Sequence, residues 1–163
     1  MAKVKTNALR LLDAAKIKYE TLEYEVDEDD LSGTHVAEVC GIDPDATFKT
    51  LVCKNDKGEH IVFCIPVAEE LDLKKCARAS GSKSVAMIPV KDILATTGYI
   101  RGGCSPVGMK KKFPTYIDET ADLFDEIYCS AGMRGMQMKI SVSDLLSFTD
   151  AKTADLTAIR TVG

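Results

Sequence analysis

The residue types best suited to binding an anion lie in one glycine-rich segment, which reads Thr97-Gly-Tyr-Ile-Arg-Gly-Gly-Cys-Ser-Pro-Val-Gly-Met-Lys-Lys-Lys112. Glycines at 102, 103 and 108 allow backbone angles that are closed to other residues, and they let a ligand approach the main chain closely. Pro106 stiffens the loop, and the lysines add positive charge beside its backbone N–H groups. The segment therefore predicts a site for a phosphate or a carboxyl-ester oxygen, with a surface turn beside a solvated lysine run as the competing interpretation.

This loop differs from the phosphate-binding loop of ATPases. Gly103 and Gly108 have the separation of the two Walker A glycines. However, Met109 stands where that motif needs lysine, and Lys111 stands where it needs a hydroxyl. The sequence therefore argues against a P-loop ATPase.

A lysine on a predicted central strand is the second candidate for chemistry. In Phe48-Lys-Thr-Leu-Val52, strand alternation places Lys49 on the same face as Leu51 and Cys53. A lysine on such an apolar face must either extend to solvent or meet an anion. The sequence alone leaves both outcomes open.

A second glycine-bearing segment, Ser130-Ala-Gly-Met-Arg-Gly135, follows a predicted strand. Taken alone, it is typical of a hairpin turn. Taken with the first loop and Lys49, it predicts a pocket that holds an oxyanion between two backbone segments without any side-chain nucleophile.

Protein-supplied nucleophilic catalysis has little support in the sequence. Neither His35 nor His60 has a neighbour that would complete a catalytic triad, and Cys104 has no evident partner base. The six cysteines lack Cys-x-x-Cys spacing, so we expect reduced thiols, no metal and no cofactor. We expect three of these cysteines to be core residues: Cys53, Cys64 and Cys129.

Composition favours one domain that spans residues 1–163, because the chain has 163 residues and is 45% hydrophobic. The net charge of −4 argues against a global basic field for nucleic acid, so any such contact must be local. The longest apolar run, residues 61–68, is too short to cross a membrane, and the N-terminus lacks a signal-peptide core. We therefore expect a soluble cytoplasmic protein. Candidates for a local basic patch are Lys49, Lys54, Arg101, Lys110, Lys111 and Lys112.

Hydrophobic periodicity and turn residues predict an α+β fold with a mixed, barrel-like sheet flanked by helices. Thr6, Asp72 and Ser141 are predicted helix N-caps, while Gly41, Gly81 and Gly98 are predicted helix ends. Helices are expected after Thr6, from residue 34, from Asp72 to residue 80, over 90–97 and from Ser141 to residue 148. Strands are expected at 19–24, 48–54, 60–66, 84–87, 116–118, 126–130 and 137–140.

Several motifs, in order along most of the chain, resemble the YbaK family of bacterial Cys-tRNA(Pro) deacylases. They are Phe48-Lys-Thr-Leu-Val, Ile65-Pro-Val with Glu70-Leu-Asp-Leu-Lys-Lys75, the 97–111 loop, and Ser130-Ala-Gly-x-Arg-Gly135. The resemblance implies the fold of the prolyl-tRNA synthetase editing insertion. It also implies hydrolysis of the ester that joins a wrongly attached cysteine to tRNA(Pro), with aminoacyl-tRNA and possible prolyl-tRNA synthetase as partners.

The resemblance also implies roles for individual residues. Lys49 would hold the terminal adenosine and its phosphate, and the loop backbone from Gly102 to Pro106 would face the ester carbonyl. The nucleophile would be the cysteinyl thiol of the substrate itself. The implied catalytic positions are Lys49, Gly102, Gly103, Ser105 and Pro106, and the implied substrate-binding positions are Tyr24, Thr50, Ser130, Gly132 and Arg134.

Three other functions stay open at this point. A related Ala-tRNA(Pro) deacylase has the same fold and uses a water nucleophile, and a deacylase of broader specificity for small amino acids would share both features. The Gly-Gly-Cys-Ser-Pro-Val-Gly form of the loop is more similar to the cysteine-specific branch. A non-catalytic module that binds RNA ends or nucleotides is the third alternative.

Overall fold

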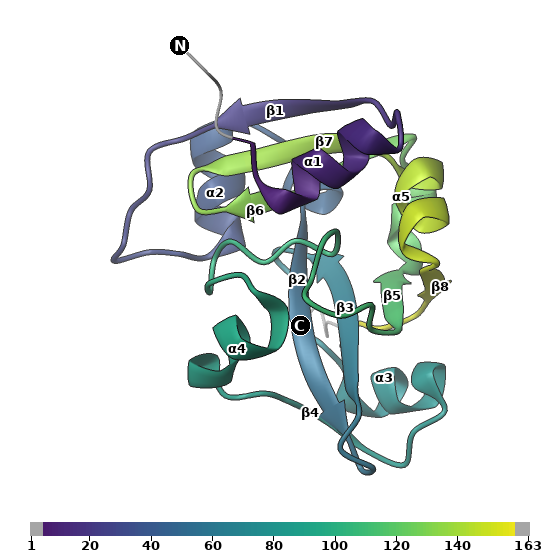
Figure 1. Ribbon diagram of the computed structural model, residues 1–163. Helices are drawn as coiled ribbons and strands as arrows, with labels where there is room; N and C mark the ends of the chain where they lie inside the picture. The colour runs from purple at the N-terminus through teal and green to yellow at the C-terminus, as the bar shows by residue number, and fades with distance from the viewer. Residues whose placement is uncertain (1–4, 159–163) are drawn as a thin grey trace.

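The computed structural model describes residues 5–158 and is drawn in Figure 1. The α-helices are α1 (Asn7–Ala14), α2 (Gly33–Cys40), α3 (Leu73–Ser80), α4 (Ile93–Thr97) and α5 (Val142–Thr149). The strands are β1 (Tyr19–Glu23), β2 (Phe48–Asn55), β3 (His60–Pro66), β4 (Val85–Met87), β5 (Thr115–Asp118), β6 (Glu126–Met133), β7 (Met136–Ser141) and β8 (Lys152–Ala154). Short 3₁₀ turns occur at Pro44–Ala46, Val90–Asp92 and Glu119–Leu123. None of the helices in this described part is long and apolar enough to cross a membrane.

The strands form two sheets. A five-stranded mixed sheet has the order β4-β2-β3-β5-β8, in which β5 is parallel to β3 and β8 while β2 is antiparallel to β3 and β4. A three-stranded antiparallel sheet has the order β1-β7-β6, and α1 lies across it (Figure 1). A parallel bridge between Thr47 and Tyr128 joins the two sheets. The predicted α+β fold with a mixed sheet is confirmed.

Both faces of the β2–β3 hairpin are covered, which explains the long apolar run in β3. Strand alternation sends Val52 and Cys64 into a core shared with α1 and the three-stranded sheet. The opposite face places Cys53 and Phe63 in a second core against α3. A strand buried on both faces has no polar side to expose, so β3 is buried from Ile61 onward.

Helix capping follows the sequence closely. The side chains of Thr6, Asp72 and Ser141 accept hydrogen bonds from backbone N–H groups in the first turns of α1, α3 and α5, as predicted. Glycines in the left-handed conformation end α2, α3 and α4 at the three predicted positions. These caps fix where each helix begins and ends, and so where the connecting loops start.

Two local expectations were wrong in detail, and one strand was not predicted. The segment predicted as one helix over 90–97 begins as the 3₁₀ turn Val90–Asp92 before α4 starts. The strand predicted to end at Ser130 continues as β6 to Met133, with an irregular register between these residues. The strand β8 was not predicted, because its three residues have no apolar alternation and depend on pairing with β5.

Thr6 links α1 to β6 and provides a test of the packing between helix and sheet. Its hydroxyl donates to the Ala131 carbonyl oxygen and accepts from the Leu9 N–H. Thr6→Ala removes both bonds, so we expect a loss of about 1–2 kcal/mol in the free energy of unfolding. Thr6→Ser keeps the hydroxyl and should lose less than half of that in urea denaturation. Equal losses in the two variants would contradict this assignment.

Candidate functional site

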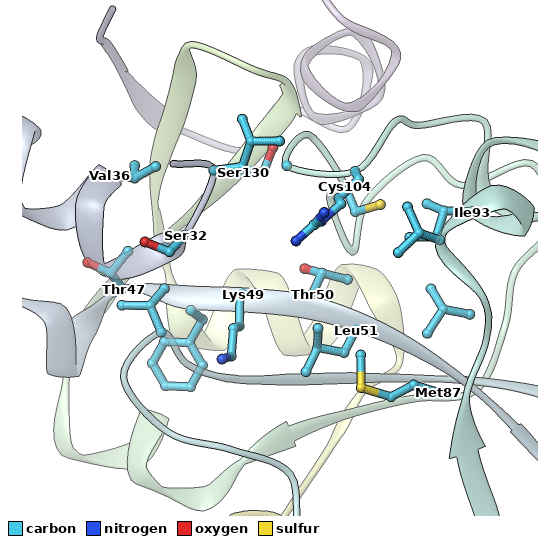
Figure 2. A pocket seen from close by; sticks show the side chains of 18 of the residues that line it. Ser32, Val36, Thr47, Lys49, Thr50, Leu51, Met87, Ile93, Cys104 and Ser130 are labelled. Carbon is cyan, nitrogen blue, oxygen red and sulfur yellow. The ribbon is translucent and has the colours of Figure 1, made fainter. Parts of the chain in front are cut away.

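A pocket of about 350 Å³ opens beside β2 and is walled by five parts of the chain. They are the edge of β2, the start of α2, the segment from β4 to α4, the glycine-rich loop and the β6–β7 pair. Figure 2 shows a close view of this site. The residues that line it are Leu31, Ser32, Gly33, Val36, Thr47, Phe48, Lys49, Thr50, Leu51, Val52, Val67, Met87, Ile88, Val90, Ile93, Arg101, Gly102, Cys104, Ser130 and Gln137.

The pocket exists because the outer edge of β2 is only partly covered. The register places β4 opposite residues 53–55 of β2, and the last contact on this edge is the Ile88 N–H donating to the Val52 carbonyl oxygen at 3.1 Å. Alternation along an antiparallel strand puts the backbone N–H and C=O of Thr50 on this same edge. The site therefore gains main-chain hydrogen-bonding groups as well as side chains.

An uncovered edge also explains how neighbouring residues on opposite strand faces line one pocket. Figure 2 shows the side chains of Lys49 and Thr50 leaving opposite sides of β2. Both residues border the pocket, because it wraps around the strand edge. The Thr50 hydroxyl contacts the Cys64 sulfur at 3.7 Å, which fixes its orientation.

Lys49 is half-buried, and its surroundings favour an anionic ligand. Burial lowers the pKa of the Lys49 ammonium, while the charges of Glu70 and Glu69 act in the opposite direction. An anion placed beside the ammonium would compensate for the lost hydration. Lys49 therefore neither snorkels fully into solvent nor lies in a dry core.

The glycine-rich loop rests directly on the β6–β7 turn. A Cβ atom on Gly103 would lie 3.1 Å from the backbone nitrogen of Arg134 and from the Cα of Met133, so a larger residue would push the loop and this turn apart by a few tenths of an ångström. The Arg134 Nε donates to the Arg101 carbonyl oxygen at 2.8 Å. These two contacts hold Arg101 and Gly102 against the pocket.

The structure brings together part of the predicted site. Lys49, Thr50, Gly102 and Ser130 all line the pocket. Tyr24 and Arg134 instead line a small adjoining hollow, which shares Gly102 with the pocket.

The remaining predicted residues lie away from the pocket. Ser105 is completely buried, and its hydroxyl accepts the Val107 N–H at 3.2 Å, so it shapes the loop from inside. Pro106 lines a separate cavity. Gly103 lies on the side of the loop that packs against the backbone of Met133 and Arg134, and Gly132 packs against Thr6. Between Gly102 and Pro106, the residues that line the pocket are therefore Gly102 and Cys104.

The predicted basic patch is divided into separate groups. Lys49 and Arg101 line the pocket. Lys110 donates to the Ala95 carbonyl oxygen, and Lys112 forms an ion pair with Asp150. Lys54 and Lys111 lie near His60 instead, whose pKa is lowered first by burial and then by these two charges.

Sequence reasoning missed two walls of the pocket. One wall is apolar and comes from the segment between β4 and α4, where Met87, Val90 and Ile93 face the site. The other contains Gln137, which pairs with Ser130 in the β6–β7 register. The pairing of Gln137 with Ser130 could have been inferred from the pattern of the β6–β7 hairpin. By contrast, nothing in the sequence places the β4–α4 segment beside β2.

The pocket carries positive charge but no base. Its titratable lining residues are Lys49, Arg101 and Cys104, with neither a histidine nor a carboxylate among the described lining residues. Burial raises the pKa of the Cys104 thiol, and a hydrogen bond with Thr97 opposes that shift, so the net effect favours the protonated form. Such a site can bind and polarise an ester, but it lacks a base paired with a nucleophile.

The other thiols and histidines lie outside the pocket. All six cysteines are free, and Cys53, Cys64, Cys76 and Cys129 are buried. This confirms the three predicted core thiols. The ring of His60 lies beside that of Phe113 at a tilt of 51°, and neither residue lines the pocket. Within residues 5–158, no cluster of three or more His, Cys, Asp or Glu side chains could hold a metal ion.

Residues 32–148 match the family model of the aminoacyl-tRNA editing domain. This range includes every residue that lines the pocket except Leu31. The chain belongs to the aminoacyl-tRNA editing domain family. The YbaK-type resemblance found in the sequence is thereby confirmed. The fold of this editing domain also agrees with that of known structures.

Two curated relatives and one solved structure illustrate the relationship. A protein of Enterococcus faecalis (strain ATCC 700802 / V583), provisionally named Cys-tRNA(Pro)/Cys-tRNA(Cys) deacylase EbsC, is 50% identical over 94% of this chain and 93% of its own length. A proline–tRNA ligase of Shouchella clausii (strain KSM-K16) is 31% identical over 61% of this chain, but over only 17% of the ligase. A crystal structure provisionally described as a trans-editing enzyme for prolyl-tRNA synthetase superposes on this chain with a TM-score of 0.79. The match covers 96% of this chain and 100% of the other chain. Because the two sequences are only 24% identical, this match supports the fold alone.

The contact at Gly103 predicts a specific sensitivity of the editing domain. Gly103→Ala forces the loop away from the backbone of the β6–β7 turn, so we expect a loss of about 1–3 kcal/mol in the free energy of unfolding. Cys104→Ala shortens the neighbouring side chain without a clash and should be milder in the same urea titration. A Gly103→Ala variant as stable as the wild type would show that the loop does not rest on this turn.

Proposed function

We propose that this chain is an editing hydrolase that cleaves the ester between cysteine and tRNA(Pro). The observation that carries the proposal is a pocket that has a half-buried lysine and a glycine-rich loop but no histidine or carboxylate among its described lining residues. The editing-domain family and the deacylase name of the 50% identical relative support the same substrate class. A single domain acting in the cytoplasm, where tRNA is charged, is part of this proposal.

The polar and apolar walls suggest how the end of the tRNA is placed. The ammonium of Lys49 would contact the phosphate of the terminal adenosine, because it is the lysine in the pocket. The ester would lie between the β2 edge and Gly102, where backbone groups can stabilise negative charge on the carbonyl oxygen. The aminoacyl group would point toward Ser130, which lines the end of the pocket formed by β6 and β7.

The reaction we propose uses the substrate's own thiol. The deprotonated cysteinyl sulfur bonds to the ester carbonyl carbon, and the bond from that carbon to the ribose oxygen breaks. Water supplies a proton to the ribose oxygen, and a second water opens the cyclic thioester to release cysteine. The protein contributes positioning and charge stabilisation, so it needs no histidine or carboxylate in the pocket.

Prolyl-tRNA synthetase is the partner we propose. The similarity to part of a proline–tRNA ligase supports this choice. A partner would also compensate for a net charge of −4, which gives the chain little general attraction for RNA. Co-sedimentation of the two proteins with tRNA(Pro), compared with each protein alone, tests the association.

Turnover of defined substrates is the direct test of the proposed activity. We expect the wild-type protein to cleave Cys-tRNA(Pro) much faster than Ser-tRNA(Pro), Ala-tRNA(Pro) or Pro-tRNA(Pro). Serine has nearly the size of cysteine, but its hydroxyl forms far less of the attacking anion near neutral pH than a thiol with a pKa of about 8.5. Equal rates for the cysteinyl, seryl and alanyl substrates would indicate a water nucleophile and a general small-residue deacylase.

Lys49 provides the first mutational test. Loss of one positioned charge-assisted contact should cost about 2–4 kcal/mol in the transition state, so Lys49→Ala should lower kcat/KM roughly thirty- to a thousandfold. Lys57→Ala removes an exposed lysine from the β2–β3 turn and serves as the matched control. Near-normal turnover by a folded Lys49→Ala protein would contradict the assignment.

Cys104 provides the test of a protein nucleophile. It is the cysteine that lines the pocket, and burial raises its pKa. Because the proposed reaction uses the substrate thiol, Cys104→Ser and Cys104→Ala should keep most of the wild-type rate in single-turnover assays. A loss as large as that of Lys49→Ala would instead identify Cys104 as the attacking group.

A further inference from the structure

One buried polar atom in the pocket has no hydrogen-bond partner. Gln137 lies in the middle of β7, where its neighbours in register are Leu22 of β1 and Ser130 of β6. Its side chain is only 7% exposed, and it lines the pocket. Among residues 5–158, the Oε1 of Gln137 is the one fully buried side-chain oxygen or nitrogen without a partner.

An unpartnered amide oxygen destabilises the fold, so its presence calls for an explanation. Burying an acceptor without a hydrogen bond costs about 1–3 kcal/mol. The adjacent positions on β7, Met136 and Met138, are buried methionines that fill their space without any polar atom. A methionine at position 137 would match Gln137 in length and would avoid this cost. A ligand donor would satisfy the oxygen when the site is occupied.

The side-chain hydroxyls that line the pocket, unlike the Gln137 oxygen, each have a partner within the protein, and the Thr50 hydroxyl contacts the Cys64 sulfur. The Ser130 hydroxyl oxygen accepts the Gly132 N–H at 3.1 Å, and the Thr47 hydroxyl donates to the Asp43 carbonyl oxygen. The Ser32 hydroxyl donates to Asp30 and accepts the His35 N–H at the start of α2. Lys49 and Arg101 are donors only. The Gln137 oxygen is therefore the buried side-chain acceptor in the described pocket that has no partner within the protein.

The chemistry of an aminoacyl ester selects among its donors. Its amino-acid part carries an α-ammonium group and, in cysteine, a thiol. A thiol is a weak donor, whereas a hydrogen bond from an ammonium group is charge-assisted and about twice as strong as a neutral one. No carboxylate lines the described pocket to pair with this cation. The ammonium group therefore gains most from a neutral amide oxygen at this position.

We propose that Gln137 positions the substrate by accepting a hydrogen bond from the α-ammonium group of the aminoacyl ester. This inference rests on the proposed function, because it specifies how the same pocket holds its substrate. Ser130 is directly opposite Gln137 across the β6–β7 pair, so the ammonium group would lie at this end of the pocket. The ester carbonyl would then lie nearer to β2 and the glycine-rich loop.

Binding of stable analogues tests this contact without requiring turnover. The probes are 3′-cysteinylamino-3′-deoxyadenosine and its 3-mercaptopropionyl counterpart, which keeps the thiol and lacks the α-amino group. Isothermal titration calorimetry should show that Gln137→Met weakens binding of the cysteinyl analogue about tenfold or more, since a hydrogen bond to a charged group is lost. The same substitution should change binding of the 3-mercaptopropionyl analogue by less than about threefold. Equal weakening of both analogues, or no weakening of either, would overturn the proposal.

Two further measurements separate positioning from a structural role. Gln137→Met removes an unpartnered buried acceptor, so its melting temperature should equal or exceed that of the wild type. A clear decrease would mean that the oxygen has a partner within the protein, and the proposal would fail. Gln137→Glu keeps an acceptor oxygen at the same place and should retain the preference for the cysteinyl analogue. Loss of that preference would also count against the proposal.

These outcomes differ from a failure of the proposed function. A wild-type protein that binds the cysteinyl analogue through Gln137 but does not cleave Cys-tRNA(Pro) would refute the deacylase activity alone. A wild-type protein that cleaves Cys-tRNA(Pro) while Gln137→Met binds both analogues normally would refute the role of Gln137 alone. Failure of the wild-type protein to bind the cysteinyl analogue would overturn the role of Gln137 as well.

Discussion

The uncovered outer edge of β2 is the constraint on which the rest of the site depends. Because β4 pairs only with residues 53–55, the backbone of Thr50 stays accessible beside the pocket. Side chains from both faces of the strand border the same pocket, so Lys49 and Thr50 both line it although they point to opposite sides of β2. The register that ends β4 early therefore creates the pocket, and α2, the β4–α4 segment and the glycine-rich loop enclose it (Figures 1 and 2).

The electrostatics of the pocket fit binding better than proton transfer. Lys49 and Arg101 supply positive charge, and the pocket offers no carboxylate or histidine in the described chain that would act as a base. Burial also raises the pKa of the Cys104 thiol in the pocket, which favours its protonated form. A site of this kind stabilises a substrate that brings its own nucleophile, and it leaves an unreactive ester intact. Discrimination would then come from the chemistry of the amino acid as well as from its size.

The sequence predicted the local structure well because local chemistry decides it. Thr6, Asp72 and Ser141 cap helices through contacts within three residues, and Gly41 ends a helix through its own backbone conformation. The position of Lys49 on β2 also follows from alternation alone. The short strand β8 could not be predicted, because it depends on a neighbour more than thirty residues away in sequence.

From the sequence, the site could be predicted only for residues that belong to a single strand or loop. Ser105 and Pro106 belong to the right loop, but its backbone turns them away from the pocket. The apolar wall around Ile93 depends on how two distant segments pack together. The isolation of the Gln137 oxygen is a property of its three-dimensional surroundings, so no sequence pattern reveals it.

The pH dependence of single-turnover cleavage of Cys-tRNA(Pro) tests the central claim that the substrate supplies the nucleophile. Between about pH 6 and about pH 8.5, the rate should rise steadily as the substrate thiol ionises, without a step near the usual histidine pKa of about 6.5. At higher pH it should fall as Lys49 loses its proton, and this fall should begin below the usual lysine value of 10.5 because burial lowers the Lys49 pKa. A rate that instead follows a group titrating near pH 6.5, or that is flat across the thiol range, would mean that the protein provides the base or that water attacks the ester.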